Sequence, residues 1–191
     1  MTRRRIVVEE ENPPSPFGKW IERNRKKQKL SVADLSDISG VSKPQLYNII
    51  RGITQNPTEE TRTKLESALK IVTPKTIIEE EQKSTSVGKL GSLEDFDPHD
   101  LESIPNESGV YVFYDISERP IYVGRSANIR RRIKQHQDRF WFKQPIVQKG
   151  SLIRIPDQEL RKQIEIILIR FLKSNAVLNQ LLVDRDLSDN E

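Results

Sequence analysis

The sequence predicts an α+β protein in which an N-terminal all-helical module is joined to a small C-terminal α/β module. In residues 15–72 apolar residues recur at helical spacing between short turns. From about residue 104 the pattern changes to the short runs GVYVFY, PIYVG and SLIRI, which are typical of β-strands. Two further helical patterns, ANIRRRIKQHQDR and one that begins at Asp157, lie beside these runs. We therefore expect a three-stranded antiparallel sheet flanked by helices.

Composition excludes several classes of protein. The chain has 191 residues, of which 35% are hydrophobic and 31% charged, and this is enough for two small domains with much exposed surface. The absence of cysteine excludes disulfide frameworks and thiol nucleophiles, and two histidines are too few for a multi-histidine metal site. No apolar run approaches the roughly 20 residues of a membrane span. With no apolar signal region at the start, we expect a cytoplasmic protein without a membrane partner.

The net charge of +4 is distributed unevenly. Residues 1–72 carry 14 basic and 9 acidic residues, residues 73–98 carry 3 and 6, and residues 121–154 carry 9 basic residues and one acid. Two basic regions separated by an acidic spacer favour a polyanionic partner that is contacted at two places. A solvated basic surface would give the same composition, so charge alone leaves both interpretations open.

Composition shifts also divide the chain into segments. Residues 73–91 mix Pro, Gly, Ser and Lys with a glutamate triplet and show no stable period, which is typical of a linker. The predicted segments are a tail at 1–14, a helical module at 15–72, a linker at 73–103, an α/β module at 104–182 and an acidic tail at 183–191.

Two short helices joined by a glycine-containing turn are predicted in the N-terminal module. Ser31 and Ser42 are good N-caps, and Gly40 lies between the two helices. This is a helix-turn-helix, and the segment LSVADLSDISGVSKPQLYNIIRG resembles the phage-repressor type of helix-turn-helix domain. The resemblance implies that the second helix enters the major groove of DNA; a helical bundle used for dimerisation or protein contacts is the alternative. The predicted DNA-binding side chains, which face away from the Leu46 and Ile49 core or flank that surface, are Lys43, Gln45, Tyr47, Asn48 and Arg51.

The first two strands bring two tyrosines together. If the DISE turn has four residues, Tyr111 and Tyr122 lie opposite each other and share a face with Phe113. Alternation then places the two phenols away from the main apolar layer. The opposite, core-facing side of the hairpin consists of Val110, Val112, Ile121 and Val123.

Charged side chains recur at helical spacing after the hairpin. Arg132 and His136 lie one turn apart, beside an apolar stripe that includes Ile129 and Ile133. In the last predicted helix Glu165 lies on the border of the apolar stripe, as expected of an acid that reaches inward.

Residues 104–182 resemble the GIY-YIG nuclease family. Residues 109–111 (GVY) match the GIY element, and residues 122–124 (YVG) match the YIG element. Arg132, His136 and Glu165 stand where the family has an arginine, a histidine and a metal-binding acid. Asn179 matches the closing asparagine, although it follows Glu165 by 14 residues, a longer gap than the family pattern suggests. Each element is common by itself, whereas six of them in order are specific.

The resemblance implies Mg²⁺-dependent hydrolysis of a DNA phosphodiester, with Mn²⁺ as a substitute metal. Glu165 would hold the metal, Arg132 would bind the scissile phosphate, and Arg125, where many relatives have lysine, would assist. A tyrosine hydroxyl would orient or deprotonate the attacking water, and Tyr111 and Tyr122 remain alternatives for this role. The remaining implied catalytic residues are His136, which would share the proton transfer, and Asn179, which would position the last helix or the metal shell.

These features together predict a sequence-specific DNA endonuclease of the restriction type. The helix-turn-helix would find the site and the α/β module would cut double-stranded DNA. A homodimer is the simplest arrangement, because cutting both strands requires two active sites. One alternative is a transcriptional regulator whose nuclease-like module binds without cutting. The other is a repair or mobile-element nuclease that prefers branched or damaged DNA.

Overall fold

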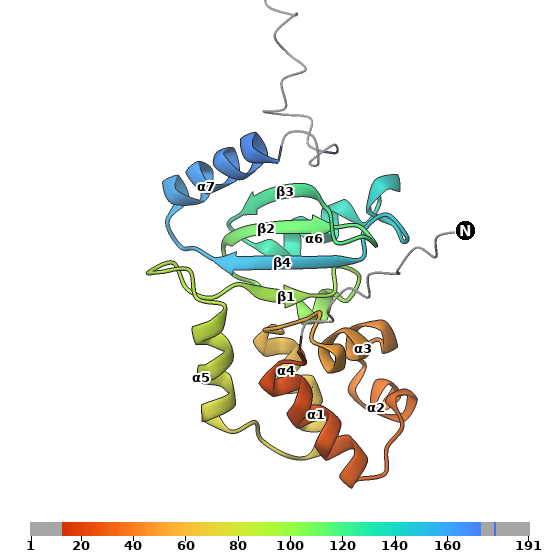
Figure 1. Ribbon diagram of the computed structural model, residues 1–191. Coiled ribbons are helices and arrows are strands. Elements are labelled where there is room, and N and C mark those ends of the chain that lie inside the picture. The colour runs from red at the N-terminus through yellow and green to blue at the C-terminus, as the bar shows by residue number, and fades with distance from the viewer. Residues whose placement is uncertain (1–12, 173–177, 179–191) are drawn as a thin grey trace, which may run out of the picture.

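The computed structural model describes residues 13–172 and Leu178. A bundle of helices lies against one edge of a sheet, and the remaining two helices cover the faces of that sheet (Figure 1). This confirms the predicted α+β class. The helices are α1 (Pro16–Lys27), α2 (Val32–Ser39), α3 (Lys43–Arg51), α4 (Glu59–Leu69), α5 (Lys75–Ser84), α6 (Ile129–His136) and α7 (Gln158–Phe171), with short 3-10 turns η1 (Leu101–Ser103) and η2 (Phe140–Phe142); the strands are β1 (Glu94–Phe96), β2 (Gly109–Tyr114), β3 (Pro120–Ser126) and β4 (Lys149–Arg154).

The predicted caps define the helices of the N-terminal bundle. The Ser31 hydroxyl accepts a hydrogen bond from the Asp34 N–H, and the Asp34 carboxylate accepts one from the Ser31 N–H, so α2 begins with a capping box. Gly40 ends α2 with a φ of 70°, a left-handed conformation that favours glycine. Ser42 then caps α3. The buried core of this bundle consists of Phe17, Trp20, Ile21, Leu35, Val41, Leu46, Ile49, Leu65 and Leu69.

Within the described residues, the strands form one four-stranded antiparallel sheet in the order β1-β4-β2-β3, which corrects the predicted three-stranded sheet because β1 adds a strand at one edge. The register of the hairpin differs from the prediction, because Tyr111 lies opposite Gly124 while Tyr122 lies opposite Phe113. The turn has five residues instead of four, and the ladder is irregular after Phe113. The pairing is therefore displaced by two residues. An even displacement keeps each side chain on its face, so both tyrosines still share a face.

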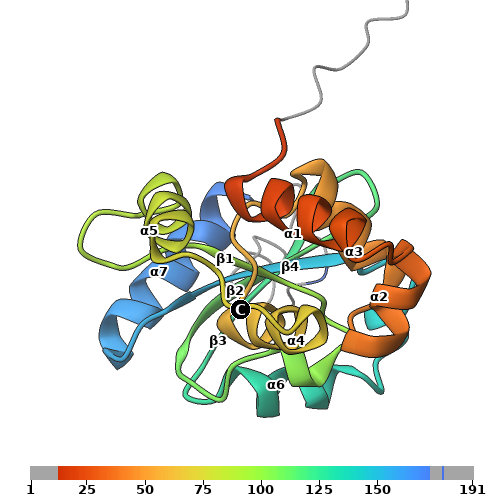
Figure 2. The same ribbon diagram turned by 90° about the horizontal axis from the view of Figure 1, so that it is seen from below.

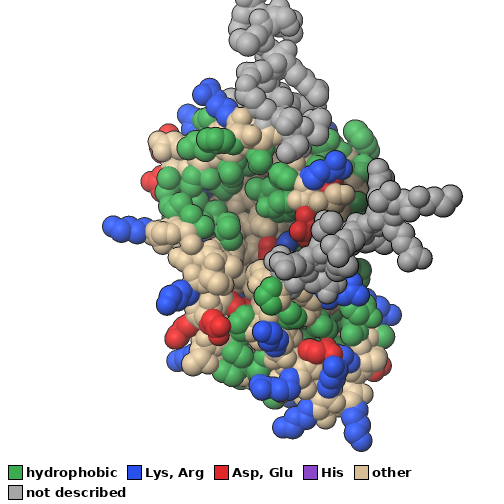
Figure 3. Space-filling model, in the orientation of Figure 1, with side chains coloured by type: hydrophobic (Ala, Val, Ile, Leu, Met, Phe, Trp, Pro, Cys, Tyr) green, Lys and Arg blue, Asp and Glu red, His purple; other side chains and the backbone are tan. Residues whose placement is uncertain are grey.

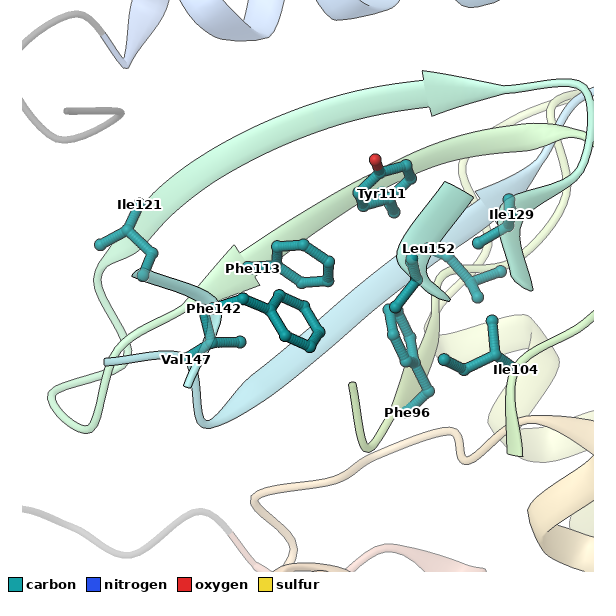
Figure 4. Packing of buried hydrophobic residues seen from close by; sticks show 10 residues of the cluster. Phe96, Ile104, Tyr111, Phe113, Ile121, Ile129, Phe142, Val147 and Leu152 are labelled. Atoms are coloured by element: carbon teal, nitrogen blue, oxygen red, sulfur yellow. The ribbon is translucent and has the colours of Figure 1, made fainter. Parts of the chain in front are cut away.

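Both faces of the sheet are covered by apolar side chains, which corrects the expectation that the phenols avoid the apolar layer. The face that carries Tyr111 and Phe113 packs against α6 and η2, and Tyr111 is only 1% exposed (Figure 4). The face that carries Val110 and Val123 packs against α7. Seen from below, α6 and α7 lie on different sides of the strands (Figure 2). Tyr111 is thus part of the larger core cluster.

The predicted linker over residues 73–103 is wrong, since this segment carries α5, β1 and η1. Glu81 in α5 is buried, where it accepts hydrogen bonds from the Phe17 N–H at 2.9 Å and from Arg62 Nη2 at 2.7 Å. β1 pairs with β4, and the Phe96 ring lies over Gly150, where a Cβ would collide with it. The acidic composition of the segment therefore reflects a buried ion pair and an edge strand.

Hydrogen bonds also join the helical bundle to the sheet. The Asp95 N–H in β1 donates to the Asn56 carbonyl at 2.8 Å, and the Gln55 N–H donates to the Asp95 carboxylate at 3.0 Å. The buried Thr58 hydroxyl, which caps α4, donates to the Ser103 carbonyl at 2.7 Å. The two halves are therefore connected through backbone groups. No helix in the described part of the chain is long and apolar enough to cross a membrane.

Candidate active site

The candidate site is built around the side chain of Tyr111, which extends from β2 over the edge strand β3. Because Tyr111 pairs with Gly124, its ring lies over the glycine backbone, and a Cβ there would lie 2.5 Å from both the Cζ and Oη atoms of Tyr111. Only glycine leaves this path open. The Tyr111 hydroxyl points from β2 toward β3 (Figure 4). Gly124 thus determines the position of the Tyr111 hydroxyl.

The Tyr111 hydroxyl is hydrogen-bonded to His136 Nε2 at 2.8 Å, and both side chains are buried. Burial, reinforced by the positive charges of Arg132 and Arg139, lowers the pKa of His136 to about 4. Burial and the neighbouring Tyr122 raise the pKa of Tyr111 well above its ordinary value, and Arg132 only partly opposes this. At neutral pH the pair is therefore an uncharged phenol beside an uncharged imidazole. In the tautomer with a proton on Nδ1, Nε2 accepts the phenolic hydrogen.

Tyr122 completes an aromatic cluster around this pair. Its ring centroid lies 6.1 Å from that of Tyr111 and 5.0 Å from that of His136. The indole of Trp141, in η2, stacks on Tyr122 with centroids 5.0 Å apart and an interplanar angle of 23°. Sequence reasoning missed η2. The signal was the run Phe140-Trp141-Phe142 directly after a basic helix, a composition typical of nucleic-acid contact.

Arg132 supplies the positive charge of the cluster from the exposed side of α6. Its Nη1 donates to the Gln135 side-chain oxygen at 3.1 Å. Partial burial lowers the pKa of Arg132, but interaction with Tyr111 and Tyr122 outweighs this and raises it overall. The structure therefore brings together four predicted residues: two tyrosines, this arginine and His136.

Glu165 and Arg125 form a second group on the other face of β3. Arg125 follows Gly124, so its side chain leaves the opposite face of the strand, where its Nε donates to Glu165 Oε2 at 2.7 Å. The Glu165 side chain is 19% exposed. Among the described residues, no hydrogen bond or ion pair links this pair to the tyrosine cluster. Asn179, predicted to close the site, lies outside the described residues.

One carboxylate is the available hard donor at this edge. In the described part of the chain no three acidic or histidine side chains gather in a way that could hold a metal ion. Glu165 shares one oxygen with Arg125. This donor set fits a hydrated Mg²⁺, which commonly binds through one or two carboxylates together with water and substrate phosphate oxygens. It does not fit a closed structural metal site.

Comparison with known families finds two matches in this chain. A model described as helix-turn-helix matches residues 21–77, and a model described as GIY-YIG catalytic domain matches residues 107–174. The chain joins a helix-turn-helix domain to a GIY-YIG domain. The first range includes α3 and its N-cap, and the second range includes the tyrosine cluster and Glu165.

Two curated relatives share sequence with this chain, and both are named UvrABC system protein C. The protein from Methanothermobacter thermautotrophicus is 34% identical over 86 residues, which cover 45% of this chain and 13% of that protein. The protein from Dictyoglomus thermophilum is 48% identical over 33 residues, which cover 17% of this chain and 6% of that protein. The chain thus spans only a small part of these relatives. Together with the family match, they support a nuclease that also carries a helix-turn-helix domain.

A solved structure was also found for comparison. A helix-turn-helix family (HTH_3) transcriptional regulator from Vibrio cholerae overlaps 75% of this chain and 97% of its own, with 15% identity and a TM-score of 0.32. This overall likeness is slight, and the assignment of the helix-turn-helix domain depends on the family match and on the observed caps and helices.

In the helix-turn-helix domain, α3 presents an outer face and an inner face. Lys43, Tyr47 and Arg51 are exposed, and the Arg51 guanidinium lies over the Tyr47 ring at 5.6 Å from its centroid. Asn48 is half-buried. Gln45 is a correction to the prediction, because it is only 5% exposed. It faces α4, where its Nε2 donates to the Thr61 hydroxyl at 3.5 Å, and no described partner bonds its Oε1.

The GIY-YIG domain covers part of the α3 surface. The Ser42 hydroxyl, at the N-terminus of α3, donates to Asp97 Oδ2 at 3.0 Å. Beside this contact lies a pocket of about 200 Å³, with Pro44 and Asn48 on one side and the hairpin turn at 115–118 on the other. Asp97, which lies between the two matched ranges, and the acidic hairpin turn of the GIY-YIG domain therefore stand next to the helix end that the sequence predicts to face DNA.

Proposed function

We propose that this protein is a sequence-specific DNA endonuclease of the restriction type that hydrolyses phosphodiester bonds with the help of Mg²⁺. The single observation that carries the proposal is the buried Tyr111–His136 hydrogen bond, held beside Arg132 at the edge of β3. A phenol, a neutral imidazole and a guanidinium at one strand edge are the groups that phosphodiester hydrolysis needs for proton transfer and charge neutralisation. The family match and the relatives support the broader statement that the chain is a nuclease.

The proton transfer is proposed to run through the tyrosine cluster. Water attacks the phosphorus atom and gives its proton to the Tyr111 oxygen, while the Tyr111 proton passes to His136 Nε2 along the 2.8 Å hydrogen bond. The bond between the phosphorus and the leaving sugar oxygen breaks, that oxygen takes up a proton from solvent water, and His136 then releases its extra proton to solvent. Arg132 neutralises the negative charge that develops on the phosphate. Tyr122, which is more exposed than Tyr111, remains the alternative proton acceptor.

Glu165 is proposed to hold the metal, with Mn²⁺ as a substitute. A bound divalent cation would stabilise charge on the phosphate and on the leaving oxygen. Arg125 is bonded to one Glu165 oxygen, and we propose that the carboxylate exchanges this partner when it binds a cation. We propose that the released Arg125 guanidinium then binds a phosphate oxygen, for which its planar fork is suited. The role of Asn179 stays a prediction.

Double-stranded DNA is the proposed partner, and the helix-turn-helix domain is proposed to select the site. Lys43, Tyr47 and Arg51 already face outward and suit phosphate or base-edge contacts. Asn48 lines the pocket beside the GIY-YIG domain, and Gln45 would have to leave its place against α4. A homodimer on DNA would supply one active site for each strand.

A plasmid-nicking assay with Mg²⁺ tests the cutting activity. We expect the wild-type protein to nick, and Glu165→Gln to nick at least about 100-fold more slowly, as removal of a key charged group generally causes. Glu159→Gln is the matched control, because Glu159 is an exposed glutamate on the same helix. If the wild type binds DNA with its fold intact but fails to nick, the regulator interpretation replaces ours.

Two further measurements separate the finer claims. Digestion of a complex DNA followed by mapping of the ends shows whether cutting is confined to one sequence, as a restriction-type enzyme requires. Cutting of branched junctions much faster than plain duplex would instead support a structure-specific nuclease. Tyr111→Phe and Tyr122→Phe identify the proton acceptor, and we expect Tyr111→Phe to cause the larger loss, because Tyr111 is the phenol bonded to His136.

A further inference from the structure

Phe140 is an exposed aromatic side chain immediately beside the candidate active site. We propose that it stacks on a DNA base next to the scissile phosphate, so that the protein binds DNA more tightly when that base is unpaired. The inference rests on the proposed cutting of DNA and goes beyond it by naming a substrate-contacting residue and the DNA conformation that this residue favours.

The three consecutive aromatic residues of η2 have very different surroundings. Phe142 is 1% exposed and belongs to the core beneath the sheet. Trp141 is half-buried between Tyr122 and His136, with ring centroids 5.0 Å and 5.2 Å away. Phe140 is 78% exposed. The two inner rings anchor the turn, so the outer ring is presented to solvent on a rigid support, which lowers the entropic cost of stacking.

The turn is attached directly to the residues of the candidate site. The Arg139 N–H donates to the His136 carbonyl at 2.8 Å, and the Phe142 N–H donates to the Arg139 carbonyl at 3.0 Å. These hydrogen bonds connect η2 directly to the end of α6. Trp141, the neighbour of Phe140, contacts both Tyr122 and His136. Phe140 therefore directly precedes, along a hydrogen-bonded turn, the indole that stacks on one of the phenols proposed to act on the phosphate.

The charges around Phe140 favour a polyanion as the occupant of this surface. Arg131, Lys134, Arg139 and Lys143 are all exposed on α6 or at the ends of η2, and Asp138 is the single acid between residues 121 and 154. Cations that follow the phosphate backbone, combined with an aromatic ring available to a base, are the usual means of binding unstacked nucleotides. For a protein partner, four exposed cations within the same short segment as the ring are a poor fit, because charged residues are depleted from the core of protein interfaces.

Binding measurements on the full-length chain without divalent metal test the inference. The probes are two short labelled duplexes of the same sequence, one fully paired and one with a single unpaired nucleotide at the cutting position. For Phe140→Ala we expect about a 5- to 100-fold loss of affinity for the duplex with the unpaired base, the range typical of losing one base–aromatic stack. Affinity for the paired duplex should change less than about twofold. Phe140→Trp should restore the loss, because an indole also stacks on bases.

Phe171→Ala is the matched control, since Phe171 is 85% exposed but lies at the end of α7, an element other than η2. Apolar side chains gather over the upper part of the face shown in Figure 3, so an exposed apolar residue is not by itself unusual in this protein. The control variant should leave both affinities unchanged. Quenching of 2-aminopurine at the unpaired position reports stacking directly and should be lost in Phe140→Ala.

Unchanged binding by Phe140→Ala, or an equal loss on both duplexes, overturns the inference. This result is independent of the proposed function, which fails instead if the wild type binds the probes but does not nick DNA after Mg²⁺ is added.

Discussion

Replacing Gly124 by alanine would test whether the glycine determines the position of the Tyr111 hydroxyl, the proposed catalytic phenol. A Cβ at this position lies 2.5 Å from the Cζ and Oη atoms of Tyr111, whereas ordinary contact begins at 3.4 Å. The Tyr111 ring therefore has to move by about 1 Å. The 2.8 Å hydrogen bond to His136 would lengthen toward about 3.8 Å, which is outside the range of hydrogen bonds.

Both activity and stability should change in this variant. A displacement of about 1 Å in a catalytic group typically lowers the rate by about 100-fold, and overpacking a core typically costs about 1–3 kcal/mol of the free energy of unfolding. Nicking of plasmid by the folded fraction measures the first effect, and urea unfolding followed by circular dichroism measures the second.

Gly150→Ala is the control that separates the two effects. Its Cβ would meet the ring of Phe96 on the same face of the sheet, so a similar loss of stability is expected. Phe96 has no part in the candidate site, and the nicking rate of the folded protein should therefore stay close to that of the wild type. If Gly124→Ala nicks as fast as Gly150→Ala at equal folded concentration, the reasoning that Gly124 positions the phenol is refuted.

Three further predictions concern stability and DNA affinity. Glu81→Gln should lower the free energy of unfolding in urea by about 3–5 kcal/mol, because it leaves Arg62 buried without its counter-charge, whereas the exposed Glu79→Gln should have little effect. The pKa of His136 is about 4 in the folded protein and about 6.5 when unfolded, so the unfolded chain binds the extra proton. Stability should be greatest above about pH 6.5 and fall by up to about 3 kcal/mol as the pH drops to about 4, a loss that should be absent in a folded His136→Gln variant. Asp97→Asn keeps an acceptor for Ser42 but removes a negative charge beside α3. It should raise duplex affinity a few-fold at low salt and not at high salt, and no gain at low salt would argue against DNA contact at this end of α3.

The sequence predicts those parts of the fold whose signals are local. The N-caps of α2 and α3, the glycine between them and the strand runs of the C-terminal half all rely on residues close together in the chain. The tyrosine cluster was also predictable in part, because Arg132 and His136 are one helical turn apart and both tyrosines stay on one face of the sheet.

The features that were missed depend on distant partners or on turn length. Glu81 belongs to a polar segment, and its burial cannot be predicted without knowing that Arg62, 19 residues earlier, neutralises its charge. β1 has three residues and pairs with a strand more than fifty positions later, so no periodicity shows it. Gln45 is an exception, because it lies one helical turn before the buried Ile49, and helical spacing by itself places it on the inner face of α3, where α4 covers it. The hairpin register cannot be predicted without knowing how many residues form the turn, and the alternation of apolar residues does not give that number.

The backbone ladder between the helical bundle and the sheet limits how the two domains can be separated or exchanged. A fragment beginning at residue 104 would lose β1, leaving the polar backbone of β4 as a bare edge that invites aggregation. A fragment beginning after residue 72 would keep β1 but remove the Gln55 and Asn56 groups that bond to Asp95. A chimera with a different DNA-binding domain would therefore have to keep these residues. In the described part of the chain, a domain boundary placed between the bundle and the sheet would break these hydrogen bonds.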